Sequence, residues 1–152
     1  LANQSMVLML KDVKHLQKNL LLYIASDNPQ IANEYNHLRT RITKVLRRLE
    51  KIRHDEDSET SILALDALKL TLKKNEGLLH ERMEQLIRDS SISTEMAISL
   101  MKDGNYTNQI IRQLIEVNSN YLKSEEQVET DAEHLVALDK DEIDTVLGEK
   151  NE

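Results

Sequence analysis

The spacing of apolar residues between 92 and 121 constrains this chain more than any other feature. Apolar side chains recur there every three or four residues, the period of one helix face. This stripe consists of Met96, Leu100, Ile110, Leu114, Val117 and Tyr121. Asp103 and Thr107 fall on the same face, and a carboxylate at core positions is costly unless it is paired. We predict one long helix with a polar interruption in its buried face.

Three earlier stretches show the same period, and we predict helices over about 5–25, 29–54 and 58–89. Asn28 before Pro29 is typical of a helix start. The first stripe is Met6, Met9, Val13, Leu16, Leu20 and Tyr23. The second is Ile31, Tyr35, Leu38, Ile42, Val45, Leu49 and Ile52. The third is Leu65, Leu68, Leu72, Asn75, Leu79, Met83 and Leu86.

The composition favours helices over strands. The 152 residues include one proline and three glycines, too few turn residues for an all-β fold. Aromatic residues make up 3%, so the core must be built from aliphatic side chains and methionine. We predict an all-α fold, an antiparallel bundle of four long helices plus a short C-terminal helix.

The character of the chain changes after residue 122. Residues 123–152 carry eleven acidic side chains against three lysines. We predict a helical-bundle domain over 1–122 and an acidic extension over 123–152, with a short helix at about 140–147. The acidic extension is expected to complement the basic face of the helix at 29–54, in the same chain or in a second copy.

Asn75 interrupts its stripe as Asp103 interrupts the last one. Both lie at about the same distance from the turn near residue 90. In an antiparallel hairpin such positions have similar heights. We therefore predict that Asn75, Asp103 and Thr107 form one buried polar layer, and such layers commonly fix the register of helices.

The outer face of the second helix is predicted to be basic, with Glu34 and Glu50 as its only acids. Two interpretations stand: a solvated face paired with acidic neighbours, or a surface for an anionic partner or anionic lipid. The net charge of −7 argues against nucleic acid as the partner. The candidate residues are Arg39, Arg41, Lys44, Arg47, Arg48 and Lys51.

Few residues suggest catalysis or metal binding. Asp55, Asp57 and Glu59 form weak candidates for a divalent-cation site, with capping of the next helix as the alternative. A chain without cysteine has no thiolate ligands. His80 is the best candidate for a phosphotransfer histidine on a helical bundle. We otherwise predict no enzyme activity, no cofactor and no metal cluster.

Two stretches resemble a known family. LMLKDVKHLQKNL at 8–20, with SDNP and IANEYNHLR within 26–39, is similar to the start of the cytosolic PhoU-like domain of bacterial sodium/phosphate cotransporters. MAISLMKDGNY at 96–106 is similar to a segment late in that domain. Asp103 keeps the family's residue. Ile98, Lys102 and Gly104 replace the usual Thr, Asn and Ser.

The resemblance covers most of 8–122 and implies a regulatory domain on the cytoplasmic face of the bacterial inner membrane. The expected partners are the transmembrane part of its own sodium-dependent phosphate transporter, a second copy of the chain and an anionic membrane surface. Because the chain begins at Leu1, we interpret it as a piece of a longer protein or as a processed protein. A free-standing PhoU-like regulator of phosphate uptake or signalling is the alternative. The family's metal-cluster motifs have no match here.

Overall fold

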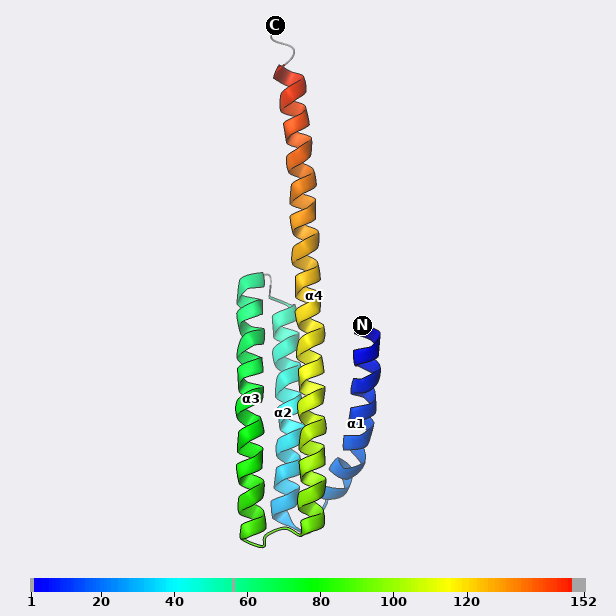
Figure 1. Cartoon of the computed structure of the whole chain (residues 1–152), viewed down its shortest axis with the longest axis vertical. Coiled ribbons are helices and arrows are strands. Elements are labelled where there is room, and N and C mark those ends of the chain that lie inside the picture. Colours follow the sequence, from blue (N-terminus) through cyan, green and yellow to red (C-terminus); the bar gives the residue numbers. More distant parts are fainter. Residues whose placement is uncertain (1, 56, 149–152) are drawn as a thin grey trace. The chain divides into compact units, whose positions relative to one another are not determined.

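The computed structural model describes residues 2–55 and 57–148, with side chains except at 2, 3, 58, 125, 126, 129 and 133–148. Four helices follow one another: α1 (Ala2–Ile24), α2 (Pro29–Arg53), α3 (Ser58–Arg88) and α4 (Thr94–Gly148). Successive helices run in opposite directions, with short turns between them (Figure 1). The all-α antiparallel bundle predicted from the spacing is confirmed.

The chain divides into two compact units, Leu1–Asn118 and Ser119–Glu152. The first contains α1, α2, α3 and the beginning of α4. The second contains the rest of α4, which includes residues 140–147 as helix without interruption. The predicted boundary at 122/123, and the expected pairing of the acidic extension with basic surface, remain predictions.

Side-chain caps set the start of α2 and tie two turns together. The Asn28 carboxamide oxygen accepts from the backbone N–H groups of Gln30 and Ile31 at 3.0 and 3.2 Å, and Pro29 occupies the first turn. This confirms the predicted start. The Asn28 Nδ2 also donates to the Ser91 carbonyl at 2.9 Å. One residue therefore joins the α1–α2 turn to the α3–α4 turn.

The α3–α4 turn has the geometry that commonly ends a helix. Ser90 adopts a φ of 51°. The N–H of Ser91 donates to the Leu86 carbonyl at 2.9 Å, and that of Ser90 to Ile87 at 3.0 Å. This pair of bonds satisfies the last carbonyls of α3. Ser93 then caps α4 by accepting from the Met96 N–H at 3.2 Å.

One buried cluster of the core lies between α2, α3 and α4 near the α3–α4 turn, and further buried residues such as Leu49, Ile52 and Leu65 continue toward the α2–α3 turn. The predicted stripes of α2 and α3 supply most of it, and Leu100 comes from the α4 stripe. Ala97 and Ile92 complete the contact set. The buried cluster is Ile31, Tyr35, Leu38, Leu79, Met83, Ile92, Ala97 and Leu100.

The stripe predicted for α1 is buried only in part. Leu16 is 5% exposed, but Met6 is 47% exposed and Val13 is 42% exposed. The covered positions of α1 include Ser5, Met9, Asp12, Leu16 and Asn19. Ser5 and Asp12 directly precede Met6 and Val13, so the face that packs on the bundle is rotated from the predicted stripe, and this part of the prediction was wrong.

α3 and α4 approach closely at Gly104. A Cβ atom added there would lie 2.3 Å from Cδ2 of Leu79. Gly104 is buried, and the absence of a side chain lets the α4 backbone reach the core residue of α3. Gly104 lies inside α4 and not at a turn. A glycine is needed here because of the close contact with Leu79.

Candidate functional site

Asp103 is the most deeply buried charged side chain of the described bundle, at 1% exposure. The Tyr35 hydroxyl donates to its Oδ2 at 2.5 Å. The Asn19 Nδ2 donates to the same oxygen at 3.0 Å. Asp103 of α4 therefore binds one residue of α1 and one of α2, and we call these three residues the Asp103 junction.

Neighbouring side chains hold the junction in place. The ring of Tyr35 stacks on that of Tyr23, with centroids 4.8 Å apart. The Tyr23 hydroxyl donates to Ser99 Oγ at 3.4 Å. Thr107, fully buried, donates to the backbone carbonyl of Asp103 at 2.8 Å. The predicted burial of Asp103 and Thr107 is confirmed. Because the Tyr35 ring is fixed by packing on Tyr23, its hydroxyl stays directed at Asp103.

Burial raises the pKa of Asp103, and the hydrogen bonds from Tyr35 and Asn19 act in the opposite direction. Burial, and then donation to Asp103, raise the pKa of Tyr35 far above its ordinary value. Tyr35 therefore remains a protonated donor over the whole physiological range. A carboxylate whose donors are fixed on two other helices is suited to setting the register of the bundle.

Asn75 lies elsewhere. It is half-buried and lines a pocket between α2 and α3 together with Arg41 and Arg82. The residue of α3 that lies against Gly104, next to Asp103, is Leu79, about one helical turn away from Asn75. Equal counts along two helices gave neither the height of Asn75 nor the direction of its side chain, so its predicted place in one layer with Asp103 and Thr107 was wrong. Asp103 takes its partners from α1 and α2 instead.

The six basic candidates of α2 separate into two groups. Arg41, Lys44 and Arg48 line the pocket between α2 and α3, and Arg82 of α3 lines it from the other helix. We call these four residues and their hollow the basic pocket. Its volume is about 520 Å³. The remaining candidates, Arg39, Arg47 and Lys51, are exposed and do not line it.

Two residues assigned to the outer face of α2 are partly or fully covered. Glu34 is 5% exposed, and its Oε2 lies 3.2 Å from the Nε of Arg82. Arg41 is half-buried, and its Nη2 donates to Oδ1 of Asn108 at 2.6 Å. The stripe of α2 is flanked by positions that contact α3 and α4. The expected placement of both residues on the outer face of α2 was wrong for this reason.

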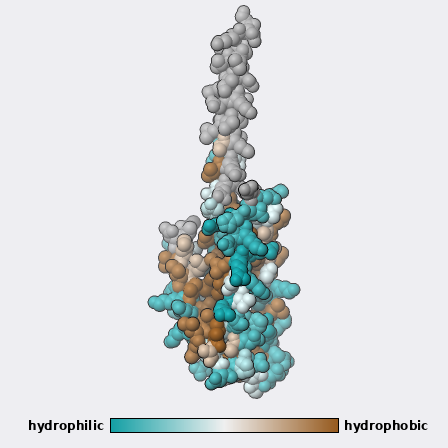
Figure 2. Space-filling model, turned by 180° about the vertical axis from the view of Figure 1, so that it is seen from behind, coloured by the Kyte–Doolittle hydropathy of each residue, from teal (hydrophilic) through white to brown (hydrophobic). Residues whose placement is uncertain are grey.

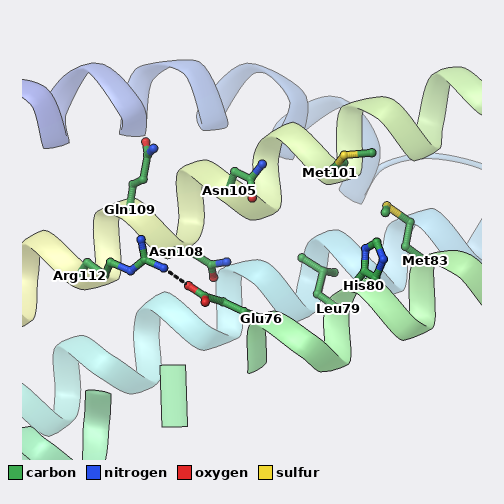
Figure 3. Close-up of a pocket in the computed structure, with 9 residues that line it drawn as sticks. All are labelled: Glu76, Leu79, His80, Met83, Met101, Asn105, Asn108, Gln109 and Arg112. Atoms are coloured by element: carbon green, nitrogen blue, oxygen red, sulfur yellow. Dashed lines mark hydrogen bonds and ion pairs between the residues drawn. The ribbon is translucent and has the colours of Figure 1, made fainter. Parts of the chain in front are cut away.

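A second hollow, of about 340 Å³, lies between α3 and α4 (Figure 3). Glu76 and Arg112 form an ion pair at one end of it. His80, Met83 and Met101 lie toward the other end (Figure 3). His80 is largely exposed, and its Nε2 lies 3.2 Å from a carboxylate oxygen of Glu84. The hollow thus has an ion pair at one end and sulfur-containing side chains at the other.

The acidic linker caps α3. The Asp57 carboxylate accepts from the Glu59 N–H at 3.2 Å and from the Thr60 hydroxyl at 2.5 Å. The bond from Thr60 lowers the pKa of Asp57. Asp55 accepts from the Asp57 N–H at 3.2 Å. Asp55, Asp57 and Glu59 therefore follow the capping alternative.

Within the part of the chain that the structure describes, no three acidic, histidine or cysteine side chains gather as metal ligands would. Over the same residues, no helix combines the length and apolar character that crossing a membrane requires.

Several residues that matter here were missed by the pattern of stripes. Asn19, Glu34 and Arg82 each directly precede a stripe residue, respectively Leu20, Tyr35 and Met83. These positions lie at the edge of the buried face, where a polar side chain can reach a neighbouring helix. The sequence signal for these three residues was a polar side chain next to an apolar stripe. The sequence does not show which residue each of them binds, because this depends on how the helices are rotated about their axes.

Comparison of the chain with protein-family models, with curated proteins and with solved structures gives no match.

Proposed function

We propose that this chain is a non-enzymatic regulatory domain of a sodium-dependent phosphate transporter at the cytoplasmic face of the bacterial inner membrane. One observation carries the proposal. The two stretches that resemble the PhoU-like domain, 8–39 and 96–106, meet at the Asp103 junction. Asn19 and Tyr35 come from the first stretch and Asp103 from the second.

This meeting matters because the two stretches are far apart in sequence. A resemblance that came only from generic leucine periodicity would give no reason for polar residues of both stretches to bind one another. A polar contact that fixes how α1, α2 and α4 pack is a reason for the three residues to occur together. The contact thus supports treating the two stretches as parts of one domain.

The proposed contact surface is the outer side of α1. Apolar surface gathers on that side of the described bundle (Figure 2). Leu10 and Leu21 are each 64% exposed. We call this surface the α1 apolar face; it consists of Met6, Val7, Leu10, Val13 and Leu21.

Charge favours a membrane-side partner for the α1 apolar face. Lys11, Lys14 and Lys18 are exposed on the same helix, and the only acid of α1, Asp12, is half-buried. α1 is therefore positive within a chain of net charge −7. Apolar side chains flanked by lysines suit contact with a transporter at an anionic cytoplasmic leaflet. The proposed occupant is the transmembrane part of the same transporter.

The test measures sodium-dependent uptake of labelled phosphate by cells that carry the gene. The double variant Leu10→Ser/Leu21→Ser is expected to change uptake by about fivefold or more, the lower range of regulatory coupling. The matched control is Leu63→Ser/Leu70→Ser on α3, where both leucines are 70% exposed. The control should leave uptake unchanged. Equal uptake in wild type and both variants, at equal protein levels, would refute the proposal.

A further inference from the structure

The basic pocket contains buried donors without acceptors. The Nε and Nη1 atoms of Arg41 are buried and have no hydrogen-bond partner. Its Nη2 is held by Asn108 at 2.6 Å. The guanidinium is thus fixed on one edge and unsatisfied on the other. Buried donors of a charged group are rarely left unpaired, and each such group in a native structure calls for an explanation.

The charges around Arg41 are unbalanced. Lys44, Arg48 and Arg82 line the same pocket, and its lining residues include no aspartate or glutamate. Burial, followed by the nearby charge of Arg82, lowers the pKa of Arg41, while Glu76 opposes this. Two carboxylates of the bundle, those of Glu34 and Glu76, already have partners. Glu34 pairs with Arg82, and Glu76 pairs with Arg112.

Neutral donors complete the pocket. Thr40 and Asn75 are half-buried and line it beside the four basic residues. Guanidinium groups present planar, paired donors that match the oxygens of phosphate and similar anions. Lysine adds a point charge, and hydroxyl and amide groups can donate to the remaining oxygens. A hollow of about 520 Å³ lies within the usual size of small-ligand sites, roughly 300–1,000 Å³.

We propose that the basic pocket binds a phosphate group through Arg41, Lys44, Arg48 and Arg82. The ligand chemistry is a tetrahedral, multiply charged oxyanion, carried by free inorganic phosphate or by the headgroup of an anionic lipid. This inference rests on the pocket alone. It does not require the proposed role in transport, and its test uses binding and not uptake.

The test uses the purified full chain and inorganic phosphate, with binding followed by calorimetry and by the ¹⁵N resonance of the Arg41 Nε. We expect a Kd of about 1 mM or lower and a shift of the Arg41 resonance. Sodium chloride at the same ionic strength should produce neither. Vesicles of phosphatidylglycerol, compared with phosphatidylcholine, form the second arm and distinguish a lipid headgroup from the free anion.

Two double variants that each remove two positive charges distinguish binding in the basic pocket from general electrostatic attraction to α2. Lys44→Gln/Arg48→Gln removes two pocket residues that are exposed and make no structural hydrogen bond within the described side chains. Arg47→Gln/Lys51→Gln removes two exposed charges of the same helix outside the pocket. The first should weaken binding about tenfold or more, the loss expected for one charge-assisted hydrogen bond. The second should leave it nearly unchanged.

Each outcome decides the matter. Binding of free phosphate that is lost only in the pocket variant supports a free anion as ligand. Binding of phosphatidylglycerol vesicles alone, lost in the same variant, supports the headgroup. Absence of both, equal weakening by the two variants, or an equal response to chloride would overturn the proposal. The thermal midpoint of each variant without ligand confirms that the fold is retained.

Discussion

The Tyr35 hydroxyl donates to the buried carboxylate of Asp103 across 2.5 Å, which joins α2 to α4 in the interior of the bundle. Asn19 adds a bond from α1 to the same oxygen. Three helices therefore meet at one acidic group. A buried charge is costly to leave unpaired, so shifts of these helices that separate the groups should be disfavoured.

Tyr35→Phe should destabilise the fold by about 1.5–3 kcal/mol, because it removes a hydrogen bond to a buried charged group. Tyr23→Phe is the matched control, since its hydroxyl makes a longer bond of 3.4 Å to Ser99. The control should cost less than about 1 kcal/mol. Urea unfolding measures both free energies. If both variants lose the same free energy of unfolding, the Tyr35–Asp103 hydrogen bond stabilises the fold no more than the Tyr23–Ser99 bond does.

The coupling between these residues is also measurable. In the background of Asp103→Asn, Tyr35→Phe should cost less than it does in the wild type. The difference should be about 0.5–3 kcal/mol, the range found for residues in direct contact. Strict additivity of the two substitutions would contradict the proposed junction.

The stability should depend on the protonation of Asp103. Its folded-state pKa is raised, so the folded state binds the proton more tightly than the unfolded state, where the pKa is about 3.9. The contribution is fully present below about pH 3.9 and is lost as pH rises through the folded-state pKa. The stability of wild type minus that of Asp103→Asn should therefore fall over this window.

Asp57 provides a control of opposite sign. The Thr60 hydrogen bond lowers its pKa, so the stabilisation by its carboxylate is present above about pH 3.9 and is lost on acidification. The stability of wild type minus that of Asp57→Asn should rise with pH. Unfolding in urea at a series of pH values measures both differences. Differences with the same slope would contradict these assignments.

Two glycines inside helices should respond differently to alanine. Nothing lies within 4 Å of a Cβ added at Gly77, whereas at Gly104 it would lie 2.3 Å from Leu79. Gly77→Ala should stabilise the fold by about 0.5–1 kcal/mol through helix propensity. Gly104→Ala should be less stable than Gly77→Ala by about 1–3 kcal/mol, the usual cost of overpacking. Thermal unfolding distinguishes them, and equal effects would argue against close contact of α3 and α4.

Ser90 adopts a left-handed conformation in the α3–α4 turn, with φ at 51°. Ser90→Gly should stabilise the fold by about 1 kcal/mol, because glycine adopts this conformation without strain. Ser93→Gly is the control: it removes the side-chain cap of α4, the bond from the Met96 N–H to Ser93 Oγ. It should cost only a few tenths of a kcal/mol. A loss of stability in Ser90→Gly, measured by thermal unfolding, would contradict the turn geometry.

Apolar spacing predicted the helices because burial of aliphatic side chains decides where they form. Tyr35, Leu38 and Leu79 occupy the core positions that the stripes assigned to them. The Asn28 cap was likewise predictable, because its capping hydrogen bonds go to Gln30 and Ile31, close by in sequence. Such local signals do not depend on how helices are rotated against one another.

The contacts between helices could not be predicted in the same way. Asn75 and Asp103 were predicted to lie in one layer, but Asn75 lines the pocket between α2 and α3, whereas Asp103 is bound by Asn19 and Tyr35. Counting along a helix does not give the direction of a side chain. The pocket that joins Arg41 to Arg82 depends on the same rotation. The exposure of Met6 has the same origin, because the covered face of α1 is rotated from the predicted stripe toward Ser5 and Asp12.

The most direct measurement of the proposed role is labelled-phosphate uptake by cells in which the coding sequence for residues 1–152 has been removed in frame. We predict that the sodium-dependent component changes by about fivefold or more, while the sodium-independent component stays the same. Identical sodium-dependent uptake with and without the domain would contradict the account.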